Sequence, residues 1–375
     1  MGVLVYIGVA FIAVMITGIC SVLTNGSSYV FERGDSKSVC NYRGGIILLA
    51  NLFIVTIILS WYSAQLATSG KLVDTVRYAW SFLYRYPTYY HNSLKSLFDA
   101  RTEPGFLVLN RLIKGFTSDP FWLFFIIACT TTSINLYVLT RLGEKRPLLV
   151  AFYLISPYFF HTTYLLRQTL AVSIGNLAFL SYQQGKRHQY FFFSVIALMF
   201  HSTAIILLPL YFILKRANWR TIYFYIPLIG LLTFLFFGPV LNFILPKVPY
   251  IGQYINIYYE TGLFRGGGSA SSVLKGIPFY FVSSLALARR RQLSKAIFNA
   301  DSYIVSCLFY SVSWLFTYNM YWFFRLGWYL LIPTLVIIPE LMDTIRNPKQ
   351  RLLYYGTLIF MMLSVTIRQI HITLN

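Results

Sequence analysis

Residues 121–140 read FWLFFIIACTTTSINLYVLT and contain no charged side chain. A helix of about 20 apolar residues can cross the hydrocarbon core of a bilayer. Similar runs recur at residues 3–24, 46–61 and 148–166. Of 375 residues, 57% are hydrophobic and only 11% are charged, less than half the charged share of a typical soluble domain. The sequence therefore predicts an all-α polytopic membrane protein, with residues 1–375 forming a single transmembrane domain.

The net charge of +20 comes from basic residues in short clusters between the apolar runs. A nucleic-acid-binding protein would gather its positive charge on one exposed face, so we expect the bilayer as a partner and no nucleic acid. Short loops rich in Lys and Arg stay on the cytoplasmic side of a membrane. The clusters that we place inside are Arg33/Lys37/Arg43, Arg141/Lys145/Arg146, Lys186/Arg187, Lys215/Arg216/Arg220, Arg289/Arg290/Arg291/Lys295 and Arg346/Lys349/Arg351.

This assignment predicts about ten transmembrane helices and places both chain ends on the outer face. The predicted spans are residues 3–24, 45–61, 119–140, 147–166, 168–183, 221–244, 274–289, 301–318, 321–339 and 352–368. Two longer outer loops follow from it. Residues 62–118 form a long, partly helical outer loop, and residues 245–273 form a second one.

One apolar stretch does not fit a simple crossing. It lies between two basic clusters that are both assigned to the inside, so a single crossing would invert every later loop. We therefore predict a re-entrant helical hairpin over residues 190–214, with His201 at its tip. Non-helical backbone at that depth requires protein or a wet cavity around it. A lone histidine among apolar residues is as often a structural hydrogen bonder as a functional group.

Two arginines stand at predicted outer membrane edges. Arg167 follows Tyr164 and precedes Gln168, and Arg325 interrupts an aromatic stretch. Either arginine can be a residue that merely snorkels to the interface. Positive charge is not needed for orientation on the outer side, however, and ionisable groups at such sites are costly. Two guanidiniums suit a phosphate or pyrophosphate, because the planar fork matches phosphate oxygens.

The outer loop 62–118 carries two further patterns. Asp74, Tyr78 and Phe82 are spaced four apart, which predicts one helical face with a carboxylate and two aromatic rings. Glu103 precedes a proline suited to the first turn of a helix. We expect this helix to place Glu103 and Asn110 opposite an apolar stripe. The stripe comprises Phe106, Leu109, Leu112, Ile113 and Phe116. Simpler interpretations are a solvated Asp74 and a helix-terminal charge at Glu103.

Several motifs do not occur in the sequence. There is no D-x-D pair, H-E-x-x-H, P-loop or dinucleotide fingerprint, and no cluster has the spacing of metal ligands. We expect neither a metal nor a cofactor. This pattern disfavours metal-dependent transfer from a nucleotide sugar and ATP-driven transport.

Five short motifs resemble, in order, those of the EpsG family, the Wzy-like polymerases of bacterial exopolysaccharide, capsule and O-antigen. They are Asp74-x-x-x-Tyr78, Glu103-Pro104-Gly105-Phe106 followed by Asn110, Arg167-Gln168-x-x-Ala171, Phe200-His201-Ser202-Thr203-Ala204, and Arg325 before Tyr329. The family often has a glycine two residues before the aspartate, where this chain has Leu72.

The resemblance implies polymerisation of undecaprenyl-pyrophosphate-linked repeat units at the outer leaflet of a bacterial inner membrane. It implies lipid-linked donor and acceptor glycans as partners, together with a chain-length regulator protein. The implied catalytic residues are Asp74, Glu103 and His201. The implied substrate-binding residues are Arg167, Arg325, Gln168, Tyr78, Asn110, Tyr164 and Tyr329.

Two alternatives remain beside the polymerase. One is a lipid-phosphate-dependent glycosyltransferase that adds a single sugar. The other is a polysaccharide exporter or flippase, for which mid-span acid–base residues or inverted repeats would be typical. Neither feature is evident in the sequence.

Overall fold

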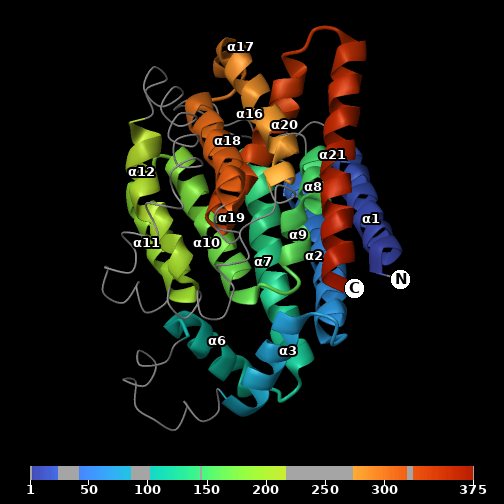
Figure 1. The fold of residues 1–375 in the computed structure, drawn as a ribbon, viewed down its shortest axis with the longest axis vertical. Helices are drawn as coiled ribbons and strands as arrows, with labels where there is room; N and C mark the ends of the chain where they lie inside the picture. Colours follow the sequence, from blue (N-terminus) through green and yellow to red (C-terminus); the bar gives the residue numbers. More distant parts are fainter. Residues whose placement is uncertain are drawn as a thin grey trace. The chain divides into compact units, whose positions relative to one another are not determined.

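The structure of the protein is a computed structural model that describes residues 2–23, 42–85, 102–143, 146–216, 273–318 and 324–374 (Figure 1). Within these ranges the regular elements are helices and no strand is present, which confirms the predicted all-α class. The predicted span 221–244, all but the last residue of the predicted outer loop 245–273, and most of the loop containing Arg33 lie outside the described residues.

Four of the described helices are long and apolar enough to cross a membrane. They cover Ala50–Thr68, Pro120–Leu142, Phe324–Asp343 and Pro348–Leu374. Shorter apolar helices accompany them, among them the stretch Val5–Ile19. The chain is therefore a multi-pass membrane protein, whereas its membrane and its orientation stay predictions.

The chain forms two compact units, which are described separately. The first comprises Met1–Leu207 with Met362–Asn375, and the second comprises Leu208–Met361. In the first unit, α2 (Tyr42–Thr68) packs on α1 (Gly2–Leu23) and on α7 (Pro120–Leu142). There α2 continues beyond the end predicted at residue 61.

The predicted span 147–166 is wrong as a single helix. It is divided into α8 (Arg146–Ile155) and α9 (Pro157–His161), and the chain then turns before α10 (Leu166–Gln183). Pro157 explains the division, because proline lacks the N–H that a continuing helix needs and clashes with the preceding turn. Proline is well placed at Pro157, the first residue of α9, where no intrahelical donor is required.

Buried amides join the central helices of the first unit. Asn176 of α10 donates from Nδ2 to Oδ1 of Asn135 at 2.9 Å, and Asn135 of α7 donates to the hydroxyl of Tyr153 in α8 at 3.1 Å. Hydrogen bonds between side chains hold helices together where lipid removes the hydrophobic driving force. These bonds fix α10, whose first turn carries Arg167 and whose other end leads to Lys186 and Arg187.

Three shorter elements follow α2 in the first unit. They are α3 (Val73–Trp80), one π-helical turn η1 (Ser81–Arg85) and α6 (Pro104–Lys114). Figure 1 shows α3 and α6 next to each other at the bottom of the view. These elements confirm that the predicted loop 62–118 is partly helical over its described part. Pro104 is the first residue of α6, as its sequence predicts.

The predicted hairpin is interrupted at the expected residue. The helix α11 (Arg187–Phe200) ends at His201, whose backbone is extended at φ −158° and ψ 131°. A 3-10 helix η2 (Ser202–Ile206) and α12 (Leu207–Lys215) follow. The hydroxyl of Tyr190 donates to the carbonyl of Leu207 at 2.6 Å, whereas a straight helix would separate these residues by about 25 Å. The chain therefore reverses near His201, and the side from which it enters a membrane stays a prediction.

The described part of the second unit is built around α18 (Ala300–Leu315), which packs on α16 (Ile277–Ala288) and α20 (Leu331–Asp343). Arg290, in α17 (Arg290–Ala296), holds Asp301 through two hydrogen bonds of 2.9 and 2.7 Å. The neighbouring Arg289 donates to the carbonyl of Thr344 at 3.5 Å. The basic clusters around residues 290 and 346 therefore share one end of this unit.

The remaining elements of the second unit connect α18 to the C-terminal helix. After α18 come η4 (Phe316–Tyr318), α19 (Phe324–Gly327) and η6 (Trp328–Leu330), which lead directly into α20. The helix α21 (Pro348–Leu374) is longer than the predicted span 352–368 and returns to the first unit. Both chain ends belong to that unit.

Candidate functional site

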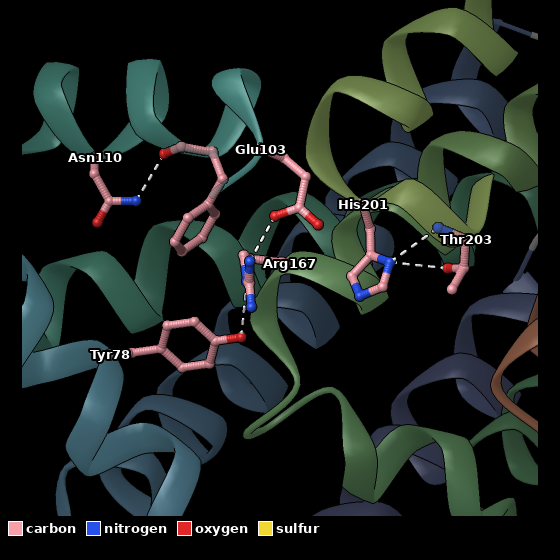
Figure 2. A network of polar contacts seen from close by, with 7 residues as sticks. Tyr78, Glu103, Asn110, Arg167, His201 and Thr203 are labelled. Atoms are coloured by element: carbon pink, nitrogen blue, oxygen red, sulfur yellow. Dashed lines mark hydrogen bonds and ion pairs between the residues drawn. The ribbon is translucent and has the colours of Figure 1, made fainter. Parts of the chain in front are cut away.

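Arg167, in the first turn of α10, is held by side chains from two other segments (Figure 2). Its Nη1 atom lies 2.5 Å from Oε2 of Glu103, and its Nε donates to the hydroxyl of Tyr78 at 3.3 Å. The guanidinium carbon also lies 5.9 Å from the centre of the Tyr78 ring. Residues that are far apart in the sequence thus converge on one guanidinium, and three predicted site residues are brought together.

The Arg167–Glu103 pair is only partly exposed to solvent. The Arg167 side chain is 29% exposed and the Glu103 side chain 18% exposed. Glu103 occupies the N-cap position of α6, yet its side chain makes no capping hydrogen bond. Its carboxylate contacts Arg167 instead, so Glu103 stands at a helix N-terminus, as the simpler interpretation has it, and also forms an ion pair with another segment. Partial burial strengthens the attraction between the two charges, because less water screens it.

Tyr78 links α3 to both other segments. Its ring meets the ring of Phe106 edge to face, with centroids 5.7 Å apart and planes at 62°. Phe82 lies four residues after Tyr78 on the same face and is fully buried. The ammonium group of Lys114, at the end of α6, lies 4.8 Å from the centre of the Phe82 ring. The predicted face of α3 therefore packs against α6, and it fixes the hydroxyl that Arg167 contacts.

Asp74 stands on this same face but has a different environment. It is half-buried in the first turn of α3, where a negative charge interacts favourably with the helix dipole. Among the residues that the structure describes, none forms a hydrogen bond or ion pair with it. The predicted catalytic role of Asp74 therefore gains no contact in support and stays a prediction.

Gly105 allows the backbone of α6 to pack closely against the last turn of α11. A Cβ atom built on Gly105 would lie 2.8 Å from the carbonyl oxygen of Met199 and 3.0 Å from its Cβ. Only glycine allows this approach of the two backbones. Because Met199 is two residues before His201, the contact places the His201 end of α11 at the Glu103 end of α6 (Figure 2).

The hydrogen bonds of His201 define the state of its ring. Its Nδ1 accepts from the backbone N–H of Thr203 at 3.2 Å and lies 2.9 Å from the Thr203 hydroxyl. A backbone N–H can only donate, so Nδ1 carries the lone pair in this arrangement. The neutral ring then has its proton on Nε2. His201 caps η2 and presents a donor, which makes it a poorer candidate for the base that takes a proton.

Asn110 lies on the other side of α6 from the one we predicted. It is fully buried, on the face that also buries Phe106 and Ile113, whereas Leu112 and Phe116 of the predicted stripe are 59% and 89% exposed. Its Nδ2 donates to the carbonyl of Phe106 at 2.7 Å. The prediction failed because outer helices of a membrane protein can expose apolar residues to lipid, so an apolar stripe need not face the protein interior.

The other predicted substrate-binding residues are distributed over both units. Gln168 is buried next to Arg167, and Tyr164 is half-buried in the turn before α10, its ring 5.7 Å from that of Phe160. Arg325 is half-buried in α19 of the second unit, and Tyr329 is fully buried there. The expectation that the guanidiniums of Arg167 and Arg325 bind a phosphate or pyrophosphate together stays a prediction.

An apolar groove of roughly 410 Å³ borders α3 on the side away from Arg167. Its lining comes from the end of α2, from α3 and η1, and from the beginning of α7, and includes Ala67, Val76, Ala79, Trp80, Leu83 and Phe124. Trp80 is 55% exposed at its edge. The helix α3 therefore presents a polar face to Arg167 and an apolar face to the groove.

The close contact of Gly105 with Met199 was not among the features predicted from the sequence. The signal for Gly105 was available, because glycine costs about 1 kcal/mol relative to alanine inside a helix and its presence in the first turn of α6 indicates a close contact. Met199 carries no such signal, because the contact involves only its backbone and its Cβ atom, which almost every residue type has. Within the described ranges, no group of three or more His, Cys, Asp and Glu side chains could hold a metal ion.

The arrangement combines a guanidinium, a carboxylate, a phenol and an imidazole N–H at one end of a membrane helix bundle. The guanidinium and the N–H can bind an anion, and the carboxylate can accept a proton. In comparisons with known proteins, the EpsG family model matches residues 49–374, which is most of the chain. No curated protein and no solved structure matches the chain.

Proposed function

Because this chain belongs to the EpsG family, which is associated with exopolysaccharide biosynthesis, we propose that it polymerises lipid-linked oligosaccharide repeat units. The substrates are glycans on undecaprenyl pyrophosphate, and the product is a surface polysaccharide such as an exopolysaccharide, capsule or O-antigen. The reaction takes place at the outer leaflet of the bacterial inner membrane. A chain-length regulator protein is the expected protein partner.

The proposed reaction is one displacement at an anomeric carbon. The oxygen of a hydroxyl on the acceptor glycan forms a bond to the anomeric carbon of the donor glycan. The bond from that carbon to the phosphate oxygen breaks, and undecaprenyl pyrophosphate leaves with the electron pair. The hydroxyl proton passes to a base. Catalysis therefore requires an anion-binding group for the pyrophosphate and a base at the acceptor.

The observation that carries the proposal is the contact of Arg167 with Glu103 and Tyr78. A guanidinium binds phosphate oxygens in the same fork geometry as a carboxylate. A pyrophosphate arriving at Arg167 therefore competes with Glu103 for the same donors. Binding of the donor lipid then releases the carboxylate, which is free to take the proton of the acceptor hydroxyl. Substrate arrival and base activation are linked through one side chain.

We assign the base to Glu103 in preference to His201. The lone pair of His201 Nδ1 is occupied by the Thr203 amide, so the neutral ring offers an N–H donor. That donor stabilises negative charge on the pyrophosphate or on the attacked sugar. The apolar groove lies on the face of α3 opposite Arg167, so it accommodates isoprene units further along the lipid and not those next to the pyrophosphate.

Deletion of the gene in its own host tests the function. The surface glycan is separated on a gel, and the deletion strain is complemented with the wild-type gene and with a Glu103→Gln variant. We expect the deletion strain to show a single capped repeat in place of the ladder of glycan lengths. We expect the wild-type gene to restore the ladder and the Glu103→Gln variant not to restore it. If the deletion strain has a full ladder whose repeats lack one branch sugar, the protein is a transferase that adds a single sugar and is not the polymerase. Loss of all surface glycan with repeats retained inside the cell would indicate an exporter.

A further inference from the structure

The helix α21, red in Figure 1, packs on the second unit with one face only over its first half. The ring of Tyr354 meets that of Phe281 in α16 edge to face, with centroids 5.7 Å apart, and Leu358 is fully buried. The hydroxyl of Tyr355 donates to the carbonyl of Pro339 at 3.5 Å. These α21 positions are spaced by three and four residues, so they form one stripe along the helix. The first half of α21 is therefore held from one side.

The opposite face of α21 carries a shallow apolar groove of roughly 610 Å³. Three large apolar side chains border it and are between 64% and 74% exposed, namely Leu352, Leu353 and Phe360. A Cβ atom built on Gly356 would meet nothing within 4 Å, so the middle of the groove is open. Lys349 and Thr357 complete the lining. An exposed apolar strip on this face thus begins at a lysine.

The groove has the depth of one leaflet of a bilayer. The helix α21 is long and apolar enough to cross a membrane, and its 27 residues rise by about 40 Å, the thickness of a bilayer with its headgroup layers. When the helix spans, Lys349 stands at headgroup depth, because it is the second residue of the helix. From Lys349 to Phe360 the helix rises by about 17 Å, roughly half of the hydrocarbon core. The groove therefore runs from the headgroups to the middle of the membrane.

The charges at the start of α21 differ between its two faces. Arg351 lies on the packed side, where its Nη1 is 3.3 Å from Oδ1 of Asp343. Lys349 lies on the groove side and is exposed, and no described residue forms an ion pair or hydrogen bond with its ammonium group. The groove thus combines a positive charge at headgroup depth with apolar surface below it. An anionic phospholipid has the complementary pattern, because its phosphate is followed by acyl chains.

A second copy of the chain fits this face less well. Membrane helices do approach each other closely at small residues, so Gly356 alone would allow such a pair. A two-fold axis along the membrane normal would pair the two α21 helices in parallel. The two Lys349 ammonium groups would then stand at one level and repel each other. The charge of this face therefore favours a lipid over a dimer.

We propose that the groove on α21 binds an anionic phospholipid, whose phosphate contacts Lys349 and whose acyl chain lies over Gly356 toward Phe360. The basic cluster around Lys349 is predicted to be cytoplasmic, so the lipid belongs to the inner leaflet. The lipid is a component of the surrounding membrane and not a substrate. The proposal is independent of the proposed function, because none of the residues around Arg167 takes part in it.

The first test measures lipid binding to the purified full-length protein in detergent. The probes are dioleoyl phosphatidylglycerol, which is anionic, and dioleoyl phosphatidylcholine, which has the same acyl chains and no net charge. The rise of the melting temperature with lipid concentration gives each affinity. We expect the anionic lipid to bind about fivefold more tightly, and Lys349→Gln to remove this difference, since one lysine near an anionic headgroup contributes that much. Lys295→Gln removes an exposed lysine of α17 and is expected to leave both affinities unchanged.

The second test fills the groove. Gly356→Leu places a side chain where a Cβ meets nothing, and leucine is a better helix former than glycine, so the variant should fold. We expect it to weaken the binding of both lipids by about tenfold, which corresponds to roughly two methylene groups that are no longer buried. Gly8→Leu is the matched control, because a Cβ at Gly8 of α1 also meets nothing within 4 Å. It is expected to leave both affinities unchanged.

Three results would overturn the proposal. Equal affinities of the parent protein for the two lipids, or equal effects of Lys349→Gln and Lys295→Gln, would show that Lys349 does not recognise a headgroup. Unchanged affinities in Gly356→Leu would show that no acyl chain lies in the groove. A dimer of the parent protein that Gly356→Leu converts to a monomer, measured by native mass spectrometry, would assign this face to a second copy of the chain.

Discussion

The guanidinium of Arg167 meets the carboxylate of Glu103 at 2.5 Å, although 64 positions separate the two residues in the sequence. The contact joins the first turn of α10 to the residue that immediately precedes α6. Tyr78 completes the arrangement from a third element. A residue that only snorkels to an interface would need none of these partners.

Replacement of Arg167 by Lys is expected to impair polymerisation while the amount of protein in the membrane is unchanged. Lysine keeps the charge and its long apolar stem, but it loses the planar fork that reaches Glu103 and Tyr78 from different nitrogens. Loss of one preorganised charge contact at a transition state costs about 100-fold or more in rate. The measurement is the ladder of glycan lengths in cells that express the variant at wild-type level. A normal ladder would support the snorkelling interpretation and remove Arg167 from the site.

Replacement of Gly105 by Ala is expected to reduce activity, because the new methyl group would lie 2.8 Å from the carbonyl oxygen of Met199. Overpacking of this kind typically costs 1–3 kcal/mol, roughly five- to 150-fold in the population of the docked arrangement. Ladder formation and membrane level are measured together. Gly8→Ala is the matched control, since nothing lies within 4 Å of a Cβ there. Equal ladders from both variants would show that α6 need not dock on α11.

Replacement of His201 by Asn separates the capping role of this residue from its chemical role. Asparagine is a good N-cap and can accept the Thr203 amide, so η2 should form as before. The variant lacks the Nε2 donor, and we expect about a tenfold or larger loss of activity at normal protein level. His201→Ala is expected to lose the cap as well, at about 1 kcal/mol. Wild-type activity in the Asn variant would reduce His201 to a structural residue.

A reporter fused after Asn375 is expected to show that the C-terminus lies on the outer face. The reason is the positive-inside rule, applied to the short basic clusters. Alkaline phosphatase, which is active only outside the cytoplasm, should be active in this fusion, and a reporter that works only in the cytoplasm should be silent. A fusion after Lys215 serves as the internal reference, because its cluster is predicted to be inside. Reversed activities would invert the whole topology and place Arg167 on the cytoplasmic side.

Much of the helical architecture could be predicted from the sequence. The helices α1, α7 and α10 begin and end within two residues of their predicted ends, and α7 is also long and apolar enough to cross a membrane. The break at His201 was also predictable from charge. Basic clusters flank residues 190–214 on both sides, and a single crossing between them would move every later basic loop to the opposite face of the membrane. The division at Pro157 was missed, although proline is the ordinary signal for it.

The candidate site shows the limit of such reasoning. The sequence by itself determined which residues are chemically able to act, because ionisable side chains at membrane edges are rare and costly. It could not decide that Arg167 pairs with Glu103, that Asn110 faces inward, or that His201 uses Nδ1 as a cap. Those outcomes depend on contacts between segments far apart in the chain, such as the approach of Gly105 to Met199. Local periodicity carries no information about such contacts, so only the tertiary structure fixed which side chains meet.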